Sequence, residues 1–253
     1  MPGWLTAGLL GLLSASGLLV GAAAGWWLEA RHRTIAAVTA VGVGLLIAAA
    51  SLYLITSALE SAPAATVAAG ALIGGAAFSL LNLVLHRWGA DNRKRCGECV
   101  RQPTEAELPG SGLAIALGSL LDAIPEALII GAAVTTVAGS FPPLALVGAF
   151  TLGNFAEGLS SSAGMKQAGR SLRYVFSVWF GIALVTSLTA VLGYAIFADI
   201  RLARGWLEAI AAGALIALVV ETMAPEAVHG QPRFSGLLAM FGFAALLIAL
   251  AQS

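Results

Sequence analysis

Eight long apolar runs dominate this sequence and constrain its fold more than any other feature. A helix needs about 20 apolar residues to cross the roughly 30 Å hydrocarbon core of a bilayer. Because the runs are continuously apolar and do not alternate, they predict helices and exclude barrel strands. A mean hydropathy of +0.91 agrees with a membrane protein. The runs cover residues 4–28, 35–57, 64–88, 112–136, 141–165, 172–198, 205–227 and 234–250.

Lys and Arg are distributed unevenly among the connections between these runs. Eleven of the thirteen lie in the first, third, fifth and seventh connections, and only Arg201 and Arg204 lie in the sixth. Cytoplasmic connections carry the excess of positive charge. We therefore predict an all-α bundle of eight transmembrane helices, a single domain over residues 1–253, with both termini outside, in the inner (plasma) membrane of the cell. The basic residues do not follow one face of a helix, so nothing indicates nucleic-acid binding.

Acidic residues inside the runs are the candidate functional residues, because an ionisable group at mid-bilayer costs about 2.5–3.5 kcal/mol. Asp122 and Glu126 are four residues apart, and Asn154 and Glu157 are three apart, so each pair shares one helix face. Glu221 lies in the seventh run. Counted from the outer ends, these five side chains lie roughly 10 to 16 residues deep, a spread of about 9 Å along a helix axis. We expect them to converge near the midplane.

A divalent cation is the expected partner of these acids. Carboxylates packed together at low dielectric repel each other and protonate unless a cation lies among them, and no Lys or Arg occurs inside the same runs. Pro125 and Pro225 donate no hydrogen bond to the carbonyl four residues before them, so each frees a backbone oxygen beside the acids. Broken helices of ion transporters build their sites in this way. A protonated, hydrogen-bonded pair is the alternative for Asp122 and Glu126.

Glu226, Glu60, Cys96 and Cys99 are weaker candidates for metal ligands. Glu226 lies near the cytoplasmic end of the seventh run, and Glu60 lies near the outer end of the second, where it would act at the entrance. Both also fit solvated helix ends. Cys96 and Cys99 lie in the cytoplasmic connection at about 89–111, spaced as in metal-binding or redox pairs. A single pair fits an incidental loop feature as well, and a reducing cytosol disfavours a disulfide.

At these residues the chain resembles the ZIP (Zrt/Irt-like) family of divalent metal transporters. That family carries an H-N-x-P-E-G type motif in its fourth span, a similar x-x-x-P-E-G motif in its fifth and an E-x-x-P-E stretch in its seventh. The eight spans, the outside termini and the long loop after the third span match as well. The matching text here is Asp122-Ala-Ile-Pro-Glu126, Asn154-Phe-Ala-Glu157-Gly158 and Glu221-Thr-Met-Ala-Pro-Glu226.

The resemblance implies a central metal site and a transport activity without enzymatic chemistry. Asp122, Glu126, Asn154 and Glu157 would form the site, with Glu221 contributing from the seventh span. The metal would be the transported ion, taken up into the cytoplasm by alternating access. Zinc is the first expectation, with manganese, iron(II) and cadmium as other ions. The partners are then the metal ion and the lipid bilayer.

Three departures from the family pattern qualify these expectations. The histidine of the fourth span is replaced by Asp122 and the proline of the fifth by Ala156. An all-oxygen site suits manganese, magnesium or iron(II) better than zinc. The sixth span has Thr186 and its neighbours where the family often has a glutamate, so we expect one metal and not two. Small residues recur in every run, as in Gly21 and Gly25, and predict close helix packing; together with the family they fit a homodimer.

Other functions stay open at the level of sequence. A cation and proton-coupled carrier of another family would use the same carboxylates as a relay. A transport-inactive membrane protein would bind the metal and not move it. An intramembrane metalloenzyme would use paired carboxylates as acid and base, but no nucleophile or substrate pocket is indicated, since Ser160, Ser161 and Ser162 fit small packing residues.

Overall fold

The computed structural model describes residues 1–28, 31–90, 102, 104, 106–136, 144–199, 204–230 and 233–252. All regular secondary structure in these ranges is helical, which confirms the all-α prediction. The bounds lie within a few residues of the predicted runs, and η denotes π-helical turns. The elements are α1 (Gly3–Trp27), α2 (His32–Ala48), η1 (Ala49–Ile55), α3 (Thr56–Ser61), α4 (Ala64–Leu85), η2 (His86–Ala90), α5 (Ser111–Thr136), α6 (Leu144–Gln167), α7 (Leu172–Asp199), α8 (Arg204–Leu218), η4 (Val219–Met223), α9 (Ala224–Gly230) and α10 (Ser235–Ala251).

Six helical segments of the described chain are long and apolar enough to cross a membrane, which makes this a membrane protein. The other two predicted spans are also helices. α6 is long enough but more polar, with three consecutive serines, and α10 is apolar but has 17 residues. The six segments are Gly3–Trp27, His32–Ser61, Ala64–Trp88, Ser111–Thr135, Leu172–Ala198 and Arg204–His229.

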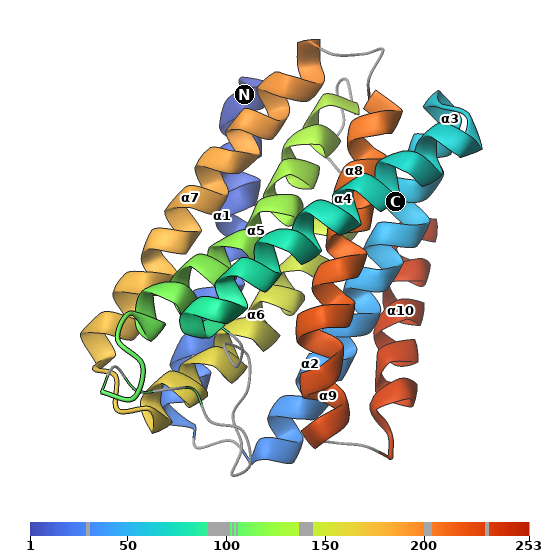
Figure 1. The fold of residues 1–253 in the computed structure, drawn as a ribbon. Coiled ribbons are helices and arrows are strands. Elements are labelled where there is room, and N and C mark those ends of the chain that lie inside the picture. The colour runs from blue at the N-terminus through green and yellow to red at the C-terminus, as the bar shows by residue number, and fades with distance from the viewer. Residues whose placement is uncertain are drawn as a thin grey trace.

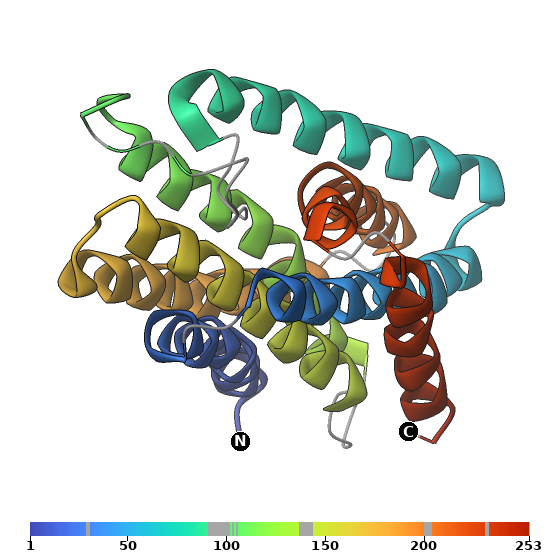
Figure 2. The same cartoon turned by 90° about the horizontal axis from the view of Figure 1, so that it is seen from below.

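The helices pack as two groups. In the first, α1 packs along α6 and α7, and α5 packs along α7. In the second, α4 packs along α8, and α2 packs along α10. The groups meet where α2 contacts α6 and where α5 contacts α4 and α8, whereas α5 and α6 touch each other sparsely. Figures 1 and 2 show α4 along one face of the bundle and α1 on the opposite face. We call the boundary between the two groups the seam.

Glycine allows the closest helix contacts. A Cβ added to Gly21 of α1 would lie 2.2 Å from the carbonyl oxygen of Phe155 in α6, and one added to Gly25 would lie 2.4 Å from that of Leu159. In the second group, a Cβ at Gly74 of α4 would lie 1.9 Å from a carbonyl oxygen of α8. Backbones this close leave no room for a side chain, so the predicted role of small residues in close packing is confirmed.

The two ends of the bundle carry different helix termini. α1 begins at the upper end of Figure 1 and α10 ends toward it. The end of α6 and the start of α7 lie at the lower end, where the basic residues Lys166, Arg170 and Arg173 gather. Lys166 Nζ there donates a 2.7 Å hydrogen bond to the carbonyl oxygen of Trp26 at the end of α1.

Candidate metal site

Asp122 and Glu126 lie on one side of α5 and are almost fully buried, at 1% and 3% exposed. Pro125 lies between them inside the helix. It has no N–H, so the carbonyl of Leu121 loses the helical hydrogen bond that this position would otherwise donate. Leu121, Pro125 and Leu128 form the other side of the same turns and face an apolar cavity. The sequence of α5 therefore separates a polar face from an apolar face within two helical turns.

Asn154 and Glu157 of α6 are also buried, at 2% and 5% exposed. Asn154 Nδ2 donates hydrogen bonds to Ser14 of α1, at 3.0 Å to Oγ and 3.3 Å to the carbonyl oxygen. These bonds orient the amide nitrogen toward α1. If Asn154 binds a metal, its ligand atom is therefore Oδ1, and Ser14 is a positioning residue that sequence reasoning missed.

Two apolar clusters bracket the polar faces of α5 and α6. One contains Ile129 of α5 with Phe150 of α6, and the other contains Ile115 of α5 with Met165 of α6. Since residue numbers increase along one helix while they decrease along the other, the two helices are antiparallel. The polar residues of α5 and α6 that the sequence singles out lie between these two clusters along their helices. We call this part of the bundle, between the two clusters, the acidic level.

Glu226 is a buried residue and not a solvated helix end. It is 1% exposed, and its Oε1 accepts a 3.3 Å hydrogen bond from Ser160 Oγ of α6. Of the two interpretations of Glu226, a metal ligand or a solvated helix end, the second is wrong, because α9 packs against α2 and the side chain meets Ser160 of α6. A fourth buried carboxylate therefore joins the polar side of α6, one turn below Glu157.

Glu221 is turned toward a different helix. It lies in the π-helical turn η4, is exposed at its outer side, and both of its carboxylate oxygens accept hydrogen bonds from α4. Asn82 Nδ2 donates to Oε2 at 2.7 Å, and Ser79 Oγ donates to Oε1. In this conformation Glu221 therefore links η4 to α4 and does not join the acids of α5 and α6, where its contribution was predicted.

The described residues hold no preassembled metal shell: no three His, Cys, Asp or Glu side chains among them are grouped to hold an ion. Glu126 Oε2 and Glu157 Oε1 are buried and accept no hydrogen bond, although both residues make other interactions. Glu60 is exposed on α3. Cys96 and Cys99 lie outside the described residues.

Glu208 is a buried carboxylate that sequence reasoning missed. It is 3% exposed, and its Oε1 lies 2.9 Å from Nε of Arg204, one turn earlier in α8. The i, i+4 spacing of the two residues was the available signal. Because this acid has its own cation at the start of α8, it differs from the group on α5, α6 and α9.

Gln102 joins the loop before α5 to α6. Its side chain is fully buried, and Nε2 donates a 3.2 Å hydrogen bond to the carbonyl oxygen of Ser161, one turn below Glu157. At the start of α5, Arg170 donates a 3.0 Å hydrogen bond to Ser111 Oγ. Gln102, which the sequence analysis did not single out, therefore lies at the lower side of the acidic level.

Comparison with known proteins does not assign a family. No family model matches the chain, and no curated protein matches it. The buried carboxylates and the two helix groups are therefore the features from which a function is inferred.

Proposed function

We propose that this protein carries divalent metal ions across a membrane, as a ZIP-like transporter. The observation that carries the proposal is the burial of four carboxylates on three helices of the bundle: Asp122, Glu126, Glu157 and Glu226 are each at most 5% exposed. At about 2.5–3.5 kcal/mol each, four ionised groups would cost roughly 10–14 kcal/mol without compensation. That is comparable to the whole stability of a typical protein, about 5–15 kcal/mol. A divalent cation offsets this cost through charge and coordination together.

The arrangement of the acids supports a moving site. Asp122, Glu126 and Glu157 belong to the first helix group, whereas Glu226 lies in α9, which packs against α2 of the second group. The Ser160 to Glu226 hydrogen bond crosses the seam. Displacement of one group against the other would break this bond and open one side of the acidic level, which is what alternating access requires. Ion binding would draw the acids of α5 and α6 together and stabilise one such state.

The orientation in the membrane rests on the charge distribution, the direction of transport rests on the ZIP resemblance, and the choice of ion rests on the resemblance and on the ligand atoms. With the basic ends of the helices in the cytoplasm, both termini lie outside the inner (plasma) membrane, and the ZIP resemblance implies uptake toward the cytoplasm. Carboxylate and amide oxygens favour manganese, iron(II) or magnesium on chemical grounds, and the ZIP resemblance favours zinc. We propose zinc as the first ion to test and manganese as the second.

Metal binding to the purified protein tests the proposal without requiring transport. The protein would be reconstituted in nanodiscs with Cys96 and Cys99 replaced by serine, so that a loop thiolate pair does not bind the ion. Bound zinc and manganese would be measured by mass spectrometry and calorimetry. We expect Glu126→Gln and Glu157→Gln to lose the bound ion, while Glu107→Gln, at an exposed position, keeps it. Equal binding by all three variants would contradict the proposed site.

A further inference from the structure

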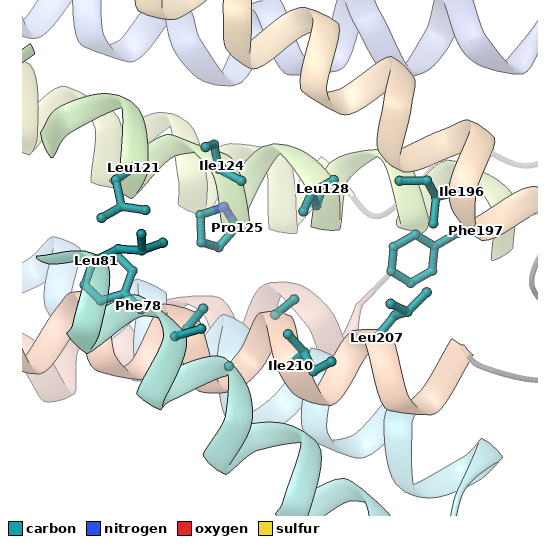
Figure 3. A pocket seen from close by; sticks show the side chains of 14 residues that line it. Phe78, Leu81, Leu121, Ile124, Pro125, Leu128, Ile196, Phe197, Leu207 and Ile210 are labelled. Carbon is teal, nitrogen blue, oxygen red and sulfur yellow. The ribbon is translucent and has the colours of Figure 1, made fainter. Parts of the chain in front are cut away.

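An apolar cavity of about 240 Å³ lies within the seam. Figure 3 shows its walls: α5 and α7 on one side, with Pro125 and Phe197, and α4 and α8 on the other, with Phe78 and Ile210. All of its lining side chains are apolar or glycine. The cavity is thus bounded by both helix groups, and its lining side chains offer no hydrogen bond or charge to an occupant.

The cavity is open toward the outer surface of the bundle and closed inside. Leu81, Ile124 and Ile196 line it and are between 37% and 54% exposed, so they form its mouth. Phe78 and Ala211 line it as well and are at most 8% exposed, so they form its floor. Because the helices that form the mouth are long and apolar enough to cross a membrane, the mouth opens to lipid and not to water.

We propose that this cavity is a binding site for a lipid acyl chain. An apolar cavity of about 150 Å³ already stays dry and takes up apolar molecules, and this one is larger. The bilayer supplies acyl chains at its mouth at very high local concentration. A chain that enters buries apolar surface on both sides of the seam and restores the van der Waals contacts that an empty cavity lacks.

The cavity and the buried acids share the same turns of α5. Leu121 and Pro125 form one wall, and Asp122 and Glu126 lie on the other side of the same turns of α5. A chain in the cavity contacts this wall together with α4 and α8, so it holds the two helix groups at a fixed separation. Its influence on ion movement depends on the proposed function, whereas the binding of the chain does not.

Photolabelling with a lipid tests the site directly. The protein would be reconstituted with a phosphatidylcholine that carries a diazirine on one acyl chain, illuminated, and mapped by mass spectrometry. We expect adducts at the floor residues Phe78 and Ala211. Ala77 lines the cavity from α4 at an exposed position, so Ala77→Phe places a large side chain in the mouth and should reduce floor labelling to background. Ala76→Phe places the same side chain at the neighbouring exposed position outside the cavity and should leave floor labelling unchanged.

Two results would overturn the proposal: adducts confined to outward residues of α4 such as Leu72 and Leu80, or floor labelling that persists in Ala77→Phe. If Ala77→Phe does not give a monodisperse protein, Ala214→Phe fills the cavity from the α8 side and serves in its place. Labelling is measured without metal, so its outcome is independent of whether the protein transports an ion.

Discussion

Replacing Gly21 by alanine should separate α1 from α6 and destabilise the protein. The new Cβ would lie 2.2 Å from the carbonyl oxygen of Phe155, whereas ordinary contact begins near 3.4 Å. The backbones must therefore move apart by about 1.2 Å at this point. Overpacking of this kind costs roughly 1–3 kcal/mol. The measured loss of stability will be smaller than this cost, because alanine stabilises a helix interior by about 0.5–1 kcal/mol relative to glycine.

Gly148 of α6 is the matched control, since a Cβ there meets no atom within 4 Å. Gly148→Ala therefore gains the stabilising effect of alanine in a helix but introduces no steric clash with a neighbouring backbone. The difference in unfolding free energy between the two variants then isolates the collision, about 1–3 kcal/mol, or roughly 2–12 °C in Tm at ~2–4 °C per kcal/mol. Tryptophan fluorescence during heating in detergent measures it. A Gly21→Ala protein as stable as Gly148→Ala would refute the close approach of α1 and α6.

Three further substitutions test individual hydrogen bonds between the helices. Asn82→Ala removes the donor to Glu221 Oε2 and should lower the unfolding free energy by about 1.5–3 kcal/mol; in a Glu221→Gln background the loss should be clearly smaller, and equal losses would contradict the pairing. Ser160→Ala removes the hydrogen bond across the seam and should cost about 0.5–1.5 kcal/mol in thermal unfolding, whereas no change would show that the bond does not contribute. Gln102→Ala should speed the modification of a cysteine placed at Ser161, in a background without Cys96 and Cys99, by a thiol reagent added from the loop side. An unchanged rate would show that Gln102 does not cover this position.

The positions of the helices could be predicted because one physical requirement determines them. A bilayer demands a continuous apolar run of fixed length, and the runs stand out in the sequence without any knowledge of contacts. The membrane character follows in the same way. Close packing at Gly21 was also predictable, since glycine at every fourth position on one face of a helix has few other uses in lipid.

The partners of individual acids could not be predicted from spacing. Depth along a helix estimates the level of a side chain, but its direction depends on helix rotation and on the local pitch. The π-helical turn η4 changes the helical register around Glu221, and its carboxylate points toward α4, where it accepts a hydrogen bond from Asn82. From its place near the end of a run, Glu226 fitted a solvated carboxylate as well as a ligand, and it is buried because α9 packs against α2 and the side chain meets Ser160. Contacts between residues so far apart in the chain leave no trace in the periodicity of either segment.

Ion uptake into proteoliposomes tests the central proposal most directly. Wild-type protein would be compared with Glu126→Gln, Glu157→Gln and the exposed control Glu107→Gln, with internal zinc or manganese read by an indicator and internal pH read in parallel. We predict saturable metal uptake by the wild type and by Glu107→Gln, and none by the other two variants when all are equally folded. Absence of uptake of any divalent ion by well-folded wild-type protein, or proton flux that needs no metal, would contradict the proposal that these carboxylates carry a metal ion.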